Sequence, residues 1–171
     1  MQIQSPQQLL ALKLHHIEDA ETQATRVLEE MRQQIQDPQF HRSIDRRMEE
    51  GREVLQGIRK SMPKLGASGG EASGQNRAAR GIIEEARTML SDIQPSALKE
   101  AAAIGALQSL EHYCIATWGT VKALAREAGE QDLVRVMDRA LDSGKQLDME
   151  LTHLAEQRVN PKATHQSRPG A

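Results

Sequence analysis

The chain has 171 residues and a formal net charge of −2, from 22 Lys and Arg against 24 Asp and Glu. This length suits one domain with a sizeable core. Because no basic tract stands out, we expect no nucleic-acid partner. No apolar run approaches the roughly 20 residues that span a bilayer, and the N-terminus carries no signal-peptide pattern. The single cysteine, Cys114, rules out a disulfide framework within one chain. We therefore expect a cytoplasmic protein without a membrane partner.

The composition favours helices packed on helices. Aromatic residues make up only 2% of the chain, while Ala, Leu, Glu, Gln and Arg are abundant. A β-sandwich or barrel would need many β-branched and aromatic side chains. The sequence therefore predicts an all-α protein.

Capping signals divide the chain into helices. Ser5 before Pro6, and Asp37 before Pro38, are typical of helix starts, and Gly129 is typical of a helix end. Between residues 64 and 75 the sequence is rich in Gly, Ser and Ala, which predicts a flexible loop. After Asn160-Pro161 we expect a disordered tail, residues 160–171. The predicted helices span about 6–35, 38–61, 76–92, 96–128 and 130–159.

Two pairs of long helices joined through a shorter one favour a four-helix bundle with an additional short helix on the crossover, in one domain over residues 1–159. A plain up-down bundle is the alternative at this point.

Several charged residues fall on the apolar faces of these helices. Advancing 100° per residue places Glu21, Glu111 and Asp148 within three apolar stripes, Arg47 within a fourth and Glu50 at its margin. A carboxylate in a core costs several kcal/mol unless its charge is compensated. A metal pair held by inward acids would compensate it, and so would an ion-pair network around Arg47. Spacing alone favours neither.

Several segments resemble one known family. Residues 110–120, Leu-Glu-His-Tyr-Cys-Ile-Ala-Thr-Trp-Gly-Thr, are similar to the EHYEIAxYGT signature of the YciE/YciF family. Residues 20–23, 81–86 and 151–155 resemble the family's AEKQ, GLIEEA and last-helix segments, in the same order. The resemblance implies a ferritin-like bundle, often a homodimer, linked to stress responses. It also implies a two-metal site with no settled activity.

The resemblance assigns the metal-ligand positions. Glu21, Glu50, Glu111 and Asp148 match the family's acids. Three positions depart from the pattern: Arg47 stands where the family has a histidine, Cys114 replaces the second acid of EHYE, and Gly144 stands where another inward acid is lost. Arginine stays protonated and does not ligate metals, but its fork fits carboxylates.

These departures lead to the hypothesis of a degenerate, metal-free site in which Arg47 does electrostatically what a metal does in relatives. The protein would then be a structural or interaction protein and a homodimer, without an enzymatic activity or cofactor. The alternative is a metalloprotein in oxidative stress defence. It would bind iron, manganese or zinc through the remaining acids, with Cys114 nearby as a further zinc ligand.

Overall fold

A computed structural model of the chain describes residues 2–66, 75–94 and 96–166, and these residues form helices joined by short connections, with no strand among them. The elements are α1 (Pro6–Gln34), α2 (Pro38–Ser61), the 3₁₀ turn η1 (Met62–Leu65), α3 (Arg77–Asp92), α4 (Ser96–Glu127), α5 (Gln131–Leu154), the π-helical turn η2 (Ala155–Val159) and α6 (Asn160–Gln166). None of the described helices is both long and apolar enough to cross a membrane.

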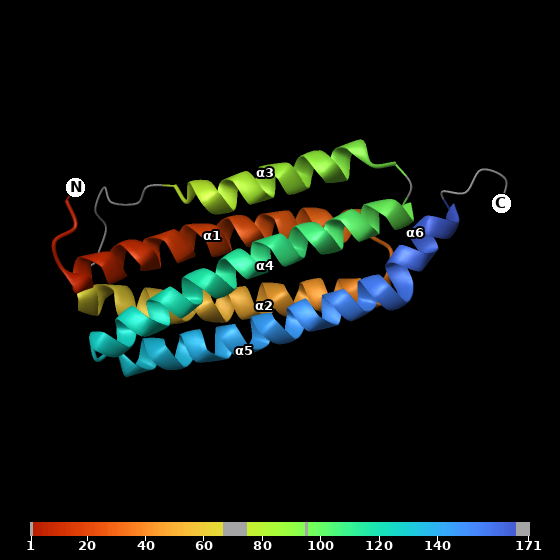
Figure 1. Ribbon diagram of the computed structural model, residues 1–171. Coiled ribbons are helices and arrows are strands. Elements are labelled where there is room, and N and C mark those ends of the chain that lie inside the picture. Colours follow the sequence, from red (N-terminus) through yellow and green to blue (C-terminus); the bar gives the residue numbers. More distant parts are fainter. Residues whose placement is uncertain (1, 67–74, 95, 167–171) are drawn as a thin grey trace.

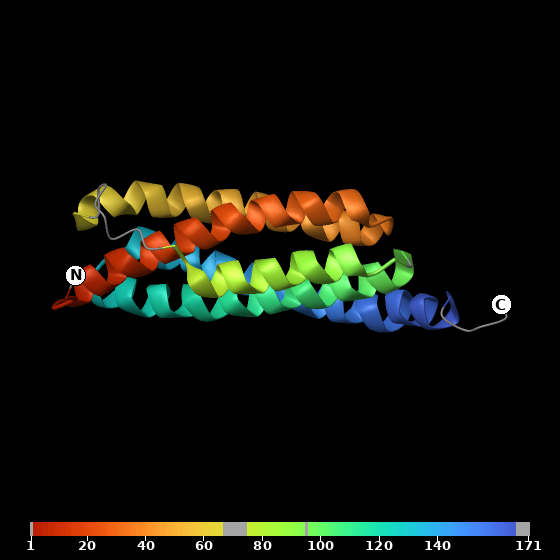
Figure 2. The same cartoon turned by 90° about the horizontal axis from the view of Figure 1, so that it is seen from above.

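Four long helices form the bundle. Helix α1 packs on α2 and α4, and α5 packs on the same two helices, so α2 and α4 lie on a diagonal. The colours in Figure 1 show that α2 and α4 run in the same direction, which requires a connection along the length of the bundle. Helix α3 makes this crossover and lies on α1 and α4, as the two views in Figures 1 and 2 agree. The predicted four-helix bundle with a short crossover helix is confirmed.

Local signals explain where these helices begin. The Ser5 hydroxyl accepts a hydrogen bond from the Gln8 N–H, and the Asp37 carboxylate accepts from two N–H groups in the first turn of α2. The Asn76 side chain caps α3 in the same way. Pro6 and Pro38 stand in the first turns, where the missing N–H has no cost.

The core runs the length of the bundle between the four long helices. It is almost entirely aliphatic, and Trp118, at 1% exposure, is its largest side chain. Every long helix contributes fully buried residues, among them Leu10, Leu14, Phe40, Ile44, Ile58, Leu107, Val121, Leu133, Leu147 and Leu151. This continuous apolar interior surrounds the few charged side chains described below.

The C-terminal helix extends further than predicted. The expected end at Asn160-Pro161 is wrong, because residues 160–166 continue as α6 and Ala163 is buried. Proline lacks an N–H and clashes with the carbonyl four residues before it in a regular helix. The wider π-helical turn of η2 relieves this conflict, and the Asn160 N–H donates to the Ala155 carbonyl five residues back.

Other parts of the predicted tail and loop fall outside the described residues. These are residues 167–171, residues 67–74 of the predicted loop, and the turn at Pro95. The loop's first residues are described: Lys64 and Leu65 belong to η1, and Gly66 ends it with a φ of 65°.

Candidate functional site

A buried arginine joins carboxylates from two other helices. Arg47, on α2, donates from Nε to Glu111 Oε2 on α4 over 2.5 Å. Its Nη1 and Nη2 donate to the two oxygens of Glu21 on α1, over 2.9 and 3.1 Å. The guanidinium fork therefore lies between the two acids and forms a bidentate pair with one of them. Three of the sequence-predicted site residues thus meet at one point in the core.

These three side chains are withdrawn from water. Arg47 and Glu21 are exposed by 1% and Glu111 by 0%. Burial alone would lower the pKa of Arg47, but the carboxylates of Glu21 and Glu111 outweigh it and raise that pKa well above its usual value. For Glu111, burial is the larger effect: it raises the pKa of the carboxyl, although the positive charge of Arg47 lowers that pKa. One fixed positive charge therefore faces two buried acids, and burial raises the pKa of Glu111 in spite of that charge.

Cys114 and Trp118 complete the surroundings of the arginine. The Cys114 thiol accepts a hydrogen bond from Arg47 Nη2 over 3.5 Å. Burial raises the pKa of this thiol well above its usual range, so it remains a neutral SH group. The Trp118 ring lies under the guanidinium, with 5.3 Å between Cζ of Arg47 and the ring centroid. This distance is typical of a cation–π contact and adds to the stabilisation of the buried charge.

Two glycines make room for the cluster. A Cβ on Gly51 of α2 would lie 2.9 Å from Glu21 Oε2 and 3.1 Å from Arg47 Nη1. A Cβ on Gly144 of α5 would lie 2.6 Å from Glu111 Oε1. Real Cβ atoms do not approach other atoms this closely, so any side chain at Gly144 would have to displace a buried carboxylate. The position where the family pattern has an acid is therefore closed to one in this packing.

Glu50 lies at the margin of the cluster, as predicted. It follows Arg47 by one helical turn, its side chain is 18% exposed, and its Oε1 accepts from the Ser143 hydroxyl. Arg46 Nε lies 3.6 Å from the same oxygen. The other oxygen, Oε2, is buried without a hydrogen-bond partner among the described residues. Glu50 thus lies between the bundle interior and the α2–α5 surface.

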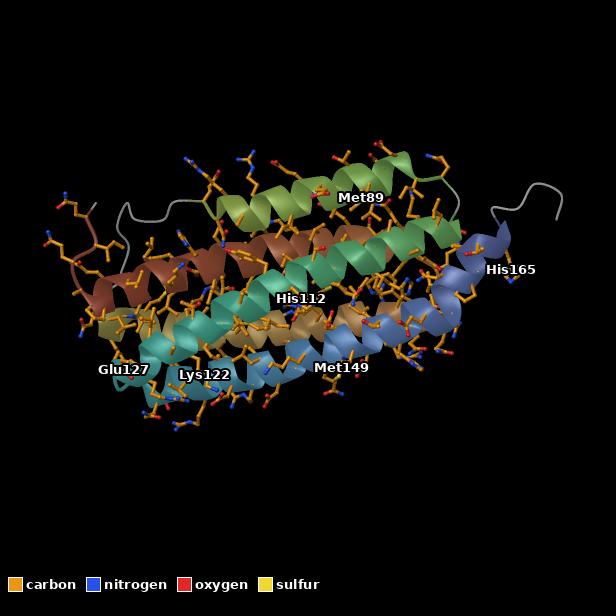
Figure 3. All side chains as sticks on the ribbon, in the orientation of Figure 1. Met89, His112, Lys122, Glu127, Met149 and His165 are labelled. Carbon is orange, nitrogen blue, oxygen red and sulfur yellow. The ribbon has the colours of Figure 1, made fainter. Side chains whose placement is uncertain are left out.

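Asp148 does not join the cluster, and the prediction that it points inward is wrong. Its side chain is 22% exposed, and its Oδ1 accepts from Gln108 Nε2 over 2.9 Å. His112 lies on the outer side of α4 and brings Nε2 within 3.2 Å of the same carboxylate oxygen. Figure 3 shows His112 on the outer side of the bundle. Helical periodicity placed Asp148 within the apolar stripe of its helix, but Gln108 and His112 on α4 offer polar partners near the surface and draw its carboxylate outward.

The residues that gather here do not fit a two-metal centre. The Arg47 guanidinium fills the space between Glu21 and Glu111, where a cation would have to lie, and a metal at contact distance would meet a fixed positive charge. Within residues 2–66, 75–94 and 96–166, no three His, Cys, Asp or Glu side chains lie close enough together to hold a metal ion. Glu111 Oε1 and Trp118 Nε1 are buried without a partner there, so the network leaves one acceptor and one donor unused.

Sequence reasoning missed a second pair of buried acids at the far end of the bundle. Glu100, 1% exposed, accepts from the backbone N–H groups of residues 36 and 37 through Oε1. Lys162 Nζ lies 3.8 Å from its Oε2, and Arg158 Nε lies 2.7 Å from Oδ2 of the buried Asp37. The C-terminal segment thus covers two acids at the α1–α2 turn. Asp37 was recognised only as a cap, and Glu100 has no motif around it that would have marked it.

Comparison with known proteins identifies the family of the chain. The family model described as a domain of unknown function, DUF892, matches residues 5–164. The protein YciF of Escherichia coli strain K12 is 36% identical over 90 residues, which are 53% of this chain and 54% of YciF. The chain belongs to the YciE/YciF family. The aligned sequence spans only about half the length of YciF, whereas the structural match described next is nearly complete.

Two solved structures have the same fold as this chain. The crystal structure of the stress protein YciF of E. coli matches with a TM-score of 0.82 and 26% identity, covering 92% of this chain and 99% of YciF. YcfI of Rhodopseudomonas palustris, for which a structural role has been suggested, matches with a TM-score of 0.79 and 29% identity, over 88% and 94% of the two chains. The ferritin-like four-helix bundle is therefore the fold of this chain.

Proposed function

We propose that this chain is a ferritin-like bundle protein whose two-metal site is degenerate and metal-free, and that it acts as a structural or interaction protein. One observation carries the proposal: the Arg47 guanidinium bonds both Glu21 and Glu111, in the core, at the position of a metal ligand in the family pattern. A side chain that is always protonated then supplies, within the chain itself, the positive charge that inward acids need.

The surroundings of Arg47 support an electrostatic role for it. The neutral Cys114 thiol takes the place of a second carboxylate, so one guanidinium faces two inward acids rather than three. Gly144 takes the place of another acid, and the space its Cβ would need is filled by Glu111 and Trp118. Cys114 and Gly144 each remove a carboxylate from the core, and Arg47 adds a positive charge. Both changes reduce the net negative charge that a metal pair would otherwise neutralise.

The cellular setting is proposed from the family. YciF is described as a stress protein, and we extend a role in the stress response to this chain. We also propose that the protein works as a homodimer in the cytoplasm, where a reduced Cys114 is the expected state. Light scattering of the purified protein measures the oligomeric state. A mass of two chains supports the homodimer, and a mass of one chain contradicts it.

The competing function is that of a metal-binding protein in oxidative stress defence. Two observations favour it, since Glu50 Oε2 and Glu111 Oε1 are buried acceptors without a partner among the described residues. A metal with carboxylate and thiolate ligands near Cys114 would use them. It would have to move Arg47 away from Glu111, and the loss of that buried ion pair makes this function the less favourable one.

Metal analysis separates the two functions. The protein is purified without chelators, and iron, manganese and zinc are measured by mass spectrometry per mole of chain. The proposal expects only traces of each metal, and a melting temperature that a chelator does not change. A near-stoichiometric metal content, or ferrous oxidation dependent on oxygen or peroxide, would establish the competing function instead.

A further inference from the structure

A surface pocket between α2 and α5 is unrelated to the buried arginine and carries a separate inference. Its volume is about 280 Å³, near the lower end of the range for small-molecule sites. Helix α2 contributes Glu50, Glu53 and Val54, and α5 contributes Val136, Arg139, Ala140 and Ser143. The pocket thus combines acids, one base and a set of small apolar side chains.

The acids lie together on one side of the pocket. Glu50 and Glu53 are three residues apart on α2, so their carboxylates lie on the same face of the helix and repel each other. The Ser143 hydroxyl donates to Oε1 of Glu50, and Arg46 Nε lies 3.6 Å from the same oxygen, whereas Oε2 is buried without a hydrogen-bond partner among the described residues. The Glu53 side chain makes no hydrogen bond or ion pair with any described residue. An ammonium group between the two carboxylates would satisfy both.

The opposite wall offers a positive charge and apolar surface. The Arg139 guanidinium, on α5, also makes no hydrogen bond or ion pair within the described part of the chain, so it is available to a carboxylate. The surface between the charged groups consists of Val54, Val136 and Ala140. Methylene groups would pack there, whereas a hydrated Mg²⁺ ion, which needs about six oxygen ligands, would find few.

We propose that this pocket binds a small zwitterion, with a primary ammonium group between Glu50 and Glu53, a short aliphatic chain against Val54 and Val136, and a carboxylate on Arg139. The ligand class is that of ω-amino acids, in which a short aliphatic chain separates the ammonium group from the carboxylate. The inference goes beyond the proposed function and does not depend on it, because the pocket uses neither Arg47 nor Glu111.

The test is a titration followed by backbone amide resonances of the full chain. The probe is 5-aminopentanoate, and pentylamine, pentanoate and magnesium chloride are titrated in parallel. We expect saturable shifts at Val136, Ala140 and Ser143 with the zwitterion at millimolar concentration or below. Each single-charge probe should bind about tenfold more weakly, because it satisfies only one end of the pocket.

Substitutions locate the binding. Glu53→Gln and Arg139→Gln should each weaken it by about tenfold, and Val54→Phe should abolish it by filling the pocket. Glu127→Gln and Arg77→Gln are the matched controls, since both residues are exposed and neither lines the pocket, and they should leave the affinity unchanged. The proposal is overturned if the zwitterion gives no saturable shift, if the pocket variants bind it as the wild type does, or if magnesium binds more tightly than the zwitterion.

Discussion

Arg47 Nε lies 2.5 Å from Glu111 Oε2, and neither side chain is more than 1% exposed. The two residues come from α2 and α4, which lie on the diagonal of the bundle. The ion pair therefore crosses the centre of the core. Glu21 bonds the other side of the same guanidinium, so that one side chain connects three of the four long helices.

Replacing Arg47 by Met should destabilise the protein by about 3–5 kcal/mol, because it leaves two buried carboxylates without a positive charge. Chemical denaturation of the variant and the wild type measures this difference. Arg46→Met is the matched control, since Arg46 is 38% exposed, and it should cost about 1 kcal/mol or less. If Arg47→Met unfolds at the same denaturant concentration as the control, Arg47 does not neutralise the acids.

A compensated variant sharpens this result. Replacing Glu21, Arg47 and Glu111 by Met together removes all three charges, so that no buried carboxylate is left unpaired. This triple variant should recover most of the unfolding free energy that Arg47→Met loses. A triple variant as unstable as Arg47→Met would mean that packing, and not uncompensated charge, caused the effect.

The raised pKa of Glu111 predicts a pH dependence. Because its folded-state pKa lies above the value of 4.5 that applies when it is solvated, the native protein holds a proton there that the unfolded chain has lost. The contribution of Glu111 to stability is therefore fully present at pH values below 4.5, and is lost as the pH rises through the folded-state pKa.

Glu111→Gln isolates this contribution, since it lacks the titrating group and keeps the shape. The unfolding free energy of the wild type minus that of the variant should fall as the pH rises from 4.5, by at most about 1.4 kcal/mol per pH unit. Denaturation at a series of pH values gives this difference. A difference that is constant, or that rises with pH, would show that Arg47 keeps Glu111 ionised throughout.

Two glycine-to-alanine substitutions should act in opposite directions. Gly144→Ala pushes a Cβ to 2.6 Å from Glu111 Oε1 and should cost about 1–3 kcal/mol. Gly105→Ala, on the exposed side of α4 with nothing within 4 Å of its Cβ, should stabilise by about 0.5–1 kcal/mol through helix propensity. Thermal unfolding of both variants provides the comparison. A Gly144→Ala protein as stable as the wild type would show that Glu111 can move aside freely.

Residues 155–166 should unfold locally more often when Arg158, which pairs with Asp37 at the α1–α2 turn, is replaced. Arg158→Ala leaves the buried Asp37 carboxylate without its ion-pair partner, and should lower stability by about 1 kcal/mol. Hydrogen exchange of the amides of residues 155–166 should accelerate, while exchange in α4 stays slow. The control is Arg77→Ala, an exposed arginine on α3. Equal exchange rates in both variants would mean that the Arg158–Asp37 ion pair does not hold the segment.

The sequence predicted the fold to a large extent because the local signals were strong. Ser5-Pro6 and Asp37-Pro38 mark helix starts that the structure places at the same residues. Composition and helical periodicity indicated a bundle, and the resemblance indicated its ferritin-like form. The prediction failed at Pro161, because whether a proline ends a helix depends on the hydrogen bonds of the preceding turn, and the π-helical turn there has no sequence signal of its own.

The candidate site was predicted only in part, for a geometric reason. Glu21, Arg47 and Glu111 lie near the middle of their apolar stripes, so small errors in helix rotation do not change their direction. Asp148 was placed within its stripe as well, but its neighbours Gln108 and His112 on α4 draw it outward, and helical periodicity does not reveal such contacts. Glu100 was missed because its partners are backbone N–H groups 63 and 64 residues away in the chain.

The most direct test of the account is an anaerobic titration of the wild type and of Arg47→Ala with ferrous, manganous and zinc ions, followed by calorimetry. If Arg47 replaces the metal, the wild type shows no stoichiometric binding, and the variant, with its buried acids uncompensated, gains a site for at least one of these ions. Stoichiometric binding by the wild type, with an affinity that the removal of Arg47 does not increase, would contradict the account.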